Sequence, residues 1–204
     1  MRIYPVWDIL YQGSFASLTD ALLAGRSLNP EDLEAGPERL HPPELLLDME
    51  RGVERIRQAI HQGEKILIFG DYDVDGVAST TLLLDFLHAV GAACDYLLPD
   101  RHLDGYGLKP SGVRRAMEKK ADLIITVDNG ISAFEALELA RGNGLDIVVV
   151  DHHQQLASLP PAHSIINPNR RDCTYPFKGL AGVGVTFKLV QALSNDFIES
   201  RERR

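Results

Sequence analysis

The chain has 204 residues, of which 45% are hydrophobic and 25% charged, proportions that are ordinary for a globular protein with one good-sized core. The formal net charge of −8 argues against a strongly basic nucleic-acid-binding surface, although it does not exclude DNA as a partner. Two cysteines are too few for a disulfide framework, and no apolar stretch reaches the roughly 20 residues that cross a bilayer, so we expect a cytoplasmic protein without membrane association.

The first 43 residues differ from the rest of the chain because they are rich in turn-forming Gly and Pro. They contain a short helical pattern at residues 18–23 and end at the pair Pro42 and Pro43. We therefore expect a short helical N-terminal appendage over residues 1–43, followed by one domain over residues 44–204.

From residue 43 onward, helical patterns alternate with short apolar runs. The spacing of apolar residues over residues 43–61 predicts an amphipathic helix that ends at Gly63. Apolar runs without polar alternation, joined by long crossovers, are typical of parallel strands that are buried on both faces. The sequence therefore predicts an α/β fold with a mostly parallel, doubly wound sheet and flanking helices. Strands are expected at residues 65–70, 95–99, 123–127, 147–150 and 164–167, and further helices at residues 77–90, 110–120, 132–141 and 185–193.

Clusters of polar residues follow four of the predicted strands. Because ligands of open α/β sheets bind beyond the carboxyl ends of the strands, we expect these clusters to lie close together. They are Asp71-Tyr-Asp73-Val-Asp75-Gly76, Arg101 with Gly105-Tyr106-Gly107, Asp128-Asn129-Gly130, and Asp151-His152-His153.

Each acidic or histidine cluster also has a purely structural interpretation. Asp73 and Asp75 could form a solvated turn, Asp128 could cap a helix, and His152 and His153 could be a surface pair. If all three structural interpretations were correct, three unrelated polar clusters would occur by chance at the ends of three strands. A shared divalent-metal site explains their common position better. Oxygen and nitrogen ligands without thiolates suit Mn²⁺ or Mg²⁺ better than structural zinc.

The cluster after the second strand has the features of a phosphate-binding turn. Arg101 could clamp a phosphate, the glycines Gly105 and Gly107 would let backbone amides approach it, and Tyr106 could stack on a base. An ordinary glycine turn with a packing tyrosine is the alternative.

In the order and spacing of these clusters, the chain resembles the DHH phosphoesterase superfamily and, within it, the RecJ-type single-strand-specific exonucleases. The resemblance covers about residues 45–193. The stretches that carry it are Gly70–Gly76, Gly105–Leu108, Thr126–Ile131, Asp151–His153, Ile166–Pro168, Tyr175–Phe177 and Leu180–Val185.

The resemblance implies a phosphodiesterase with two Mn²⁺ or Mg²⁺ ions that releases mononucleotides from the 5′ end of single-stranded DNA, in repair and recombination alongside other repair proteins. Asp73 and Asp75 are implied to favour one ion each, Asp128 to bridge the ions and His152 to bind the second. Asp71 is a further candidate ligand. Asp151 is implied to orient the imidazole of His152, and His153 to act on the scissile phosphate.

Two departures from the family pattern affect these expectations. Phe69 stands where many members of the superfamily have a metal-binding His. The family's last carboxylate ligand and its second lobe have no match before Arg204, so we expect the N-terminal part of a longer enzyme, weak or inactive by itself. Two alternatives stay open: another DHH phosphodiesterase that acts on short oligoribonucleotides or cyclic dinucleotides, and a truncated binding module without activity.

Overall fold

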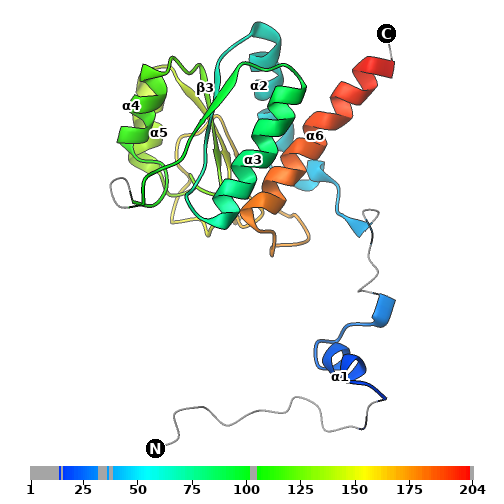
Figure 1. Ribbon diagram of the computed structural model, residues 1–204. Helices are drawn as coiled ribbons and strands as arrows, with labels where there is room; N and C mark the ends of the chain where they lie inside the picture. Colours follow the sequence, from blue (N-terminus) through cyan, green and yellow to red (C-terminus); the bar gives the residue numbers. More distant parts are fainter. Residues whose placement is uncertain (1–13, 15, 32–35, 37–38, 102–104, 203–204) are drawn as a thin grey trace, which may run out of the picture. The chain divides into compact units, whose positions relative to one another are not determined.

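The structure is a computed structural model, and it describes residues 14, 16–31, 36, 39–101 and 105–202 (Figure 1). The chain divides into two compact units, Met1–Leu40 and His41–Arg204. In the first unit, helix α1 (Leu18–Ala24) begins at Ser17, whose hydroxyl accepts a hydrogen bond from the amide of Asp20. This helix lies where the sequence predicts one; the expected boundary after residue 43 stays a prediction.

The second unit is built on a five-stranded sheet in which every neighbouring pair of strands is parallel. The order β2-β1-β3-β4-β5 confirms the predicted α/β fold. After β1, the chain adds β2 on one side of it and then β3, β4 and β5 on the other side. The direction in which the sheet grows therefore reverses, and the reversal lies between β1 and β3. Open α/β sheets bind their ligands at such a reversal. The strands are β1 (Ile66–Phe69), β2 (Cys94–Leu97), β3 (Leu123–Val127), β4 (Asp146–Val150) and β5 (Ser164–Ile166).

Helices cover both faces of the sheet, α2, α3 and α6 on one face and α4 and α5 on the other (Figure 1). Their bounds are α2 (Met49–Gln62), α3 (Val74–Ala89), α4 (Pro110–Glu118), α5 (Phe134–Gly142) and α6 (Gly182–Glu202). Side chains alternate between the two cores: Ile66 and Ile68 pack under the first layer, Leu67 and Phe69 under the second. Burial on both faces explains why the strands are continuous apolar runs. In the described part of the chain, no helix is long and apolar enough to cross a membrane.

The helix predicted over residues 43–61 is interrupted. A short 3-10 turn, η3 (Pro43–Leu45), comes first, and α2 begins only at Met49. Between them Asp48 adopts a left-handed backbone conformation with φ 63°, and its carboxylate accepts hydrogen bonds from the amide of Ile165 and the guanidinium of Arg170. These partners lie more than 100 residues away in the sequence, so the local spacing could not reveal where the helix begins.

Candidate metal centre

The loops after β1, β3 and β4 bring two groups of potential metal ligands together. One group is Asp71, Asp73 and Asp128, and the other is Asp128, His152 and His153. Within each group, one ligand atom of every residue lies within 4.8 Å of the others. Asp128 belongs to both groups and therefore occupies the shared position between them.

The backbone around Asp128 is shaped to present its side chain. Asp128 directly follows β3 and has a left-handed conformation with φ 62°, which Asp tolerates better than most residues. The next residue holds this turn, because the Asn129 side chain donates hydrogen bonds to the carbonyl oxygens of Phe69 and Val127. From the start of α6, Gly182 approaches so closely that a Cβ there would lie 2.4 Å from Asp128 Oδ1. Only glycine leaves room for the carboxylate.

Two buried carboxylates in this centre lack hydrogen-bond partners among the described residues. They are both oxygens of Asp71 and Oδ1 of Asp128, whose residues are 1% and 2% exposed. Burial, with the charges of Asp75 and Asp73, raises the pKa of Asp128 to about 8, and burial also raises the pKa of Asp71. Buried carboxylates are normally paired, and a divalent cation would supply the missing partner and remove the repulsion. The donor set therefore fits such an ion.

His152 has the geometry of a metal-binding histidine. Its Nδ1 lies 3.1 Å from the carbonyl oxygen of Leu180 and must carry the hydrogen, because a carbonyl can only accept. The other nitrogen, Nε2, lies 3.1 Å from Asp128 Oδ1 and 3.7 Å from Asp75 Oδ2. No hydrogen bond links Nε2 to Asp128 Oδ1 despite the short distance. An imidazole that donates one N–H to a carbonyl and turns its other nitrogen toward carboxylates is the usual arrangement at a metal.

Asp73 and Asp75 lie at the start of α3 and have different surroundings. Asp73 caps the helix by accepting a hydrogen bond from the amide of Gly76 at 3.0 Å. Asp75 reaches across to the N-terminus of α6, where its two oxygens accept hydrogen bonds from the amides of Gly182 and Val183, each at 2.7 Å. The structure therefore groups Asp73 with the unpaired carboxylates and leaves Asp75 beside His152. Which of them binds an ion stays a prediction.

Asp151 is completely buried and organises the two histidines that follow it. Its oxygens accept hydrogen bonds from the amides of Ile131, His152 and His153 and from His153 Nδ1. Burial alone would raise the pKa of Asp151, but these hydrogen bonds, that of the His153 ring above all, hold it below the ordinary value. The same ring bond raises the pKa of His153 against the effect of burial. Asp151 therefore orients the ring of His153. The expectation that it orients the His152 ring is wrong, because Asp151 contacts only the backbone amide of His152 and the ring of His152 lies against the Leu180 carbonyl.

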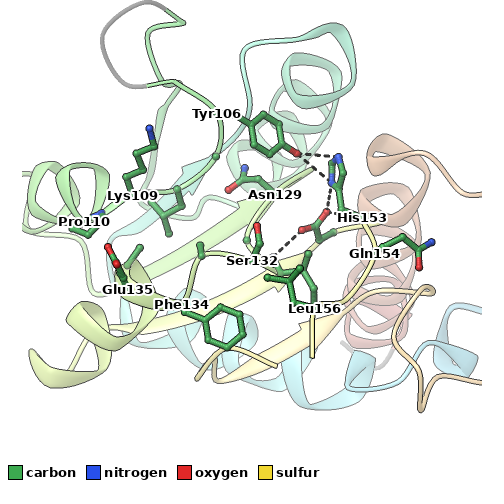
Figure 2. A pocket seen from close by; sticks show the side chains of 17 residues that line it. Tyr106, Lys109, Pro110, Asn129, Ser132, Phe134, Glu135, His153, Gln154 and Leu156 are labelled. Atoms are coloured by element: carbon green, nitrogen blue, oxygen red, sulfur yellow. Dashed lines mark hydrogen bonds and ion pairs between the residues drawn. The ribbon is translucent and has the colours of Figure 1, made fainter. Parts of the chain in front are cut away.

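The turn after β2 brings Tyr106 to this imidazole. Gly105 and Gly107, on either side of it, have φ 70° and φ 71°, the left-handed conformation that glycine adopts freely. The hydroxyl of Tyr106 lies 2.9 Å from His153 Nε2, and Figure 2 shows the two side chains facing each other. The guanidinium of Arg101 lies 5.5 Å from the centre of the Tyr72 ring, beside the first aspartate cluster. The predicted roles of these residues toward a substrate remain predictions.

Three residues that support the site were given no role in it from the sequence, although Asn167 and Leu180 lie in stretches that carry the family resemblance. Asn167 and Asn169 donate side-chain hydrogen bonds to the backbone carbonyls of His153 and His152, and Leu180 accepts from the His152 ring. The asparagines directly follow β5, so a polar pair at one more strand end was the signal that could have identified them. Leu180 contributes its backbone carbonyl, which every residue has, so its residue type could not indicate this role.

Comparison with known proteins identifies close relatives of this arrangement. The family model described as "DHH family, N-terminal domain" matches residues 65–203. The single-stranded-DNA-specific exonuclease RecJ of Bacillus subtilis (strain 168) is 46% identical over 153 residues, which are 75% of this chain and 20% of that protein. The protein of the same name from Escherichia coli (strain K12) is 44% identical over 174 residues, covering 84% of this chain and 30% of the relative.

Solved structures give the same picture. A crystal structure of exonuclease RecJ bound to manganese superposes with a TM-score of 0.69 at 32% identity, covering 74% of this chain and 38% of the other. RecJ from Thermus thermophilus in complex with Mn²⁺ gives a TM-score of 0.70 at 28% identity over 87% of this chain and 25% of the other. The chain spans about a fifth to a third of the length of the curated relatives it matches.

Proposed function

This chain belongs to the DHH family, and we propose that it carries the metal-dependent phosphodiesterase site of a RecJ-type exonuclease, which releases mononucleotides from the 5′ end of single-stranded DNA. The observation that carries the proposal is the buried carboxylate of Asp128, whose Oδ1 accepts no hydrogen bond within the described part of the chain and which belongs to both groups of ligand atoms. The names of the relatives support the substrate. Such an enzyme would work on DNA in the cytoplasm, together with other repair proteins.

We propose that Mn²⁺ or Mg²⁺ ions bind at the two groups that share Asp128. Asp71 and Asp73 would hold one ion and His152 the other, with Asp75 at the edge of the second position. A pair of such ions, when bound, supplies Lewis acidity to a water molecule and to the phosphate oxygens. The titles of the superposed structures, which print manganese, support the choice of ion.

The side chains around the centre have separate tasks in this proposal. His153, with Nδ1 held by Asp151, directs Nε2 toward the space where a phosphate would lie, and in its charged form it stabilises negative charge there. The hydrogen bond from its Nδ1 to Asp151, which raises the pKa of His153, favours that charged form. Arg101 and the turn of Gly105 and Gly107 are proposed to hold a phosphate of the same strand.

The test is a Mn²⁺ titration by calorimetry combined with an assay of nucleotide release from 5′-labelled single-stranded DNA. Asp128→Asn is the matched control, because it keeps the shape of the side chain and removes its charge. We expect saturable Mn²⁺ binding by the unaltered chain, weakened at least a hundredfold in the variant. Because the chain is expected to be weak by itself, nucleotide release should be slow and metal-dependent, and the variant should lose it. Double-stranded DNA and single-stranded RNA of the same sequence test the substrate. Absence of Mn²⁺ binding below millimolar concentrations, or measurable release that is equal for both proteins, would contradict the proposal.

A further inference from the structure

The turn that follows β5 carries the two asparagines whose side chains hold the backbone of the site histidines. Asn167 Nδ2 donates a hydrogen bond to the carbonyl oxygen of His153 at 3.0 Å, and Asn169 Nδ2 donates one to that of His152 at 2.5 Å. The two asparagines are themselves linked, because the amide of Asn169 donates to Asn167 Oδ1 at 2.7 Å. The position of this turn therefore helps to decide where the backbone of both histidines lies.

Arg170 fixes the other side of the same turn. The residue is 7% exposed, and all three nitrogens of its guanidinium donate hydrogen bonds. Nε and Nη2 donate to the two oxygens of Asp172, at 3.0 and 2.8 Å, which is the bidentate arrangement of a strong charged pair. Nη1 donates to Asp48 Oδ2 and to the carbonyl oxygen of Ile165, each at 2.7 Å. The guanidinium therefore clamps the turn to two distant segments of the chain.

Both of these segments belong to the rigid frame of the domain. Asp48 directly precedes α2, and its Oδ2 also accepts a hydrogen bond from the amide of Ile165 in β5 at 3.1 Å. Residues 167–172, in contrast, form neither a helix nor a strand. A buried guanidinium cannot leave its carboxylate partners without a large cost, because its charge would then be unpaired. Arg170 therefore transmits the position of α2 and β5 to the turn.

We propose that Arg170 is a positioning residue of the metal centre, which holds the turn so that Asn167 and Asn169 set the backbone of His153 and His152. It acts through the two asparagines, because the hydrogen bonds of its own side chain go to other residues. The inference rests on the proposed function in one respect, that His152 binds an ion. Groups that orient metal ligands change metal affinity by about 10- to 100-fold when they are removed.

Arg55 offers a matched control at the opposite end of the sheet. It is 8% exposed, and its guanidinium also joins two carboxylates, those of Asp146 at 2.7 Å and Glu64 at 2.8 Å. Asp146 is the first residue of β4 and Glu64 precedes β1, so this clamp lies at the amino ends of the strands. Removing either guanidinium should lower the stability of the domain, but only the loss of Arg170 should affect the histidines.

The experiment compares the unaltered chain with Arg170→Gln and Arg55→Gln. In the metal-free proteins, NMR should show that the amides of His152 and His153 exchange hydrogen at least about tenfold faster in Arg170→Gln, relative to amides of β3 that report global unfolding. Calorimetry should show Mn²⁺ binding weakened about tenfold in Arg170→Gln and unchanged in Arg55→Gln.

A milder variant keeps the test open if Arg170→Gln does not fold. Arg170→Lys retains the charge but has one nitrogen in place of three, so it cannot reach Asp48, Asp172 and the Ile165 carbonyl together. Its Mn²⁺ affinity should lie between those of the unaltered chain and Arg170→Gln. An affinity equal to that of the unaltered chain, with equal exchange at the histidine amides, would count against the clamp.

A double-mutant cycle tests whether Arg170 acts through the asparagines. Asn169→Ala should weaken Mn²⁺ binding by itself, because it releases the carbonyl of His152. Combined with Arg170→Gln, it should weaken binding by less than about threefold beyond Arg170→Gln alone, since both changes act on one connection. Effects that multiply in full would show that the two residues act separately and would overturn the inference.

The remaining results separate this inference from the proposed function. Mn²⁺ binding of unaltered strength in folded Arg170→Gln would overturn the positioning role and leave the metal centre intact. An equal loss of Mn²⁺ affinity in Arg55→Gln would overturn it too, because both losses would then reflect reduced stability. Faster exchange at the histidine amides of Arg170→Gln, in a chain that binds no Mn²⁺ in its unaltered form, would support the positioning role and contradict the proposed function.

Discussion

Replacing Asp128 by Asn should stabilise the metal-free protein, although it removes the central metal ligand. The Asp128 residue is 2% exposed, and burial with the charges of Asp75 and Asp73 raises its pKa from 3.8 to about 8. Between these two pH values the folded state binds the proton more tightly than the unfolded chain does. Stability therefore falls as the pH rises through this window, by about 1.4 kcal/mol for each pH unit. At pH 7 the charge costs on the order of 4 kcal/mol, and Asn avoids this cost.

The assay is urea denaturation of the two proteins in the presence of a chelator at several pH values between 5 and 7. The free energy of unfolding of Asp128→Asn minus that of the unaltered chain should grow by about 2–3 kcal/mol over this range. The pKa of Asp71 is raised by burial and not by Asp128, so its titration largely cancels in the difference. The pKa of His153 is raised by its hydrogen bond to Asp151 and also by the charge of Asp128, so part of the measured growth reports the interaction of His153 with Asp128. Mn²⁺ at 100 times its Kd stabilises the protein that binds it by about 2.7 kcal/mol, so it should narrow the advantage of the non-binding variant at pH 7 from about 4 to about 1–2 kcal/mol. Parallel pH profiles for the two proteins would refute the reasoning.

Three further predictions concern the same centre. Gly182→Ala puts a methyl group 2.4 Å from Asp128 Oδ1 and should weaken Mn²⁺ binding at least tenfold in calorimetry. Gly184→Ala is the control, because its methyl group meets only the Leu180 side chain, at 3.3 Å, and should leave the affinity unchanged. Equal Mn²⁺ affinities of the two variants would contradict this prediction. Tyr106→Phe removes the hydroxyl 2.9 Å from His153 Nε2 and should slow DNA hydrolysis about three- to tenfold at unchanged Mn²⁺ affinity, and an unchanged rate would show that the hydroxyl is dispensable. Mn²⁺ binding should tighten as the pH rises to about 8, because binding at pH 7 releases nearly one proton from Asp128. The buffer takes up this proton, so the measured binding heat should depend on the ionisation enthalpy of the buffer. The same heat in all buffers would contradict the prediction.

The grouping of the site could be predicted because it depends on a simple geometric rule. Each apolar run is a parallel strand, and parallel strands end at the same edge of the sheet. Asp71, Asp128 and His152 follow three different strands and meet for that reason alone. The rule needs only local information, since runs of apolar residues and the polar residues after them are visible in the sequence.

The properties of the individual side chains could not be predicted in this way, because they depend on contacts between distant segments. From the sequence, Asn129 is only a neighbour of Asp128, yet its side chain joins β1 to β3 through the carbonyls of Phe69 and Val127. Asp73 is implied by the family resemblance to be a metal ligand and Asp71 is only a further candidate, and nothing in the local sequence shows which of the two is buried. In the structure, Asp71 is the buried one and Asp73 the exposed helix cap.

Asp75 shows how such a distant contact changes the chemistry of a residue. Its two oxygens already bind the amides of Gly182 and Val183, 107 and 108 positions further along the chain. A carboxylate oxygen has more than one lone pair, so Oδ2 can accept from Gly182 and still face an ion beside His152 Nε2, 3.7 Å away. Asp75 would therefore link an ion at this position to the start of α6. A side chain at position 182 would collide with Asp128, so glycine is needed there. The beginning of α6 would therefore contribute to the centre through the backbone amides of Gly182 and Val183 and through the small size of Gly182.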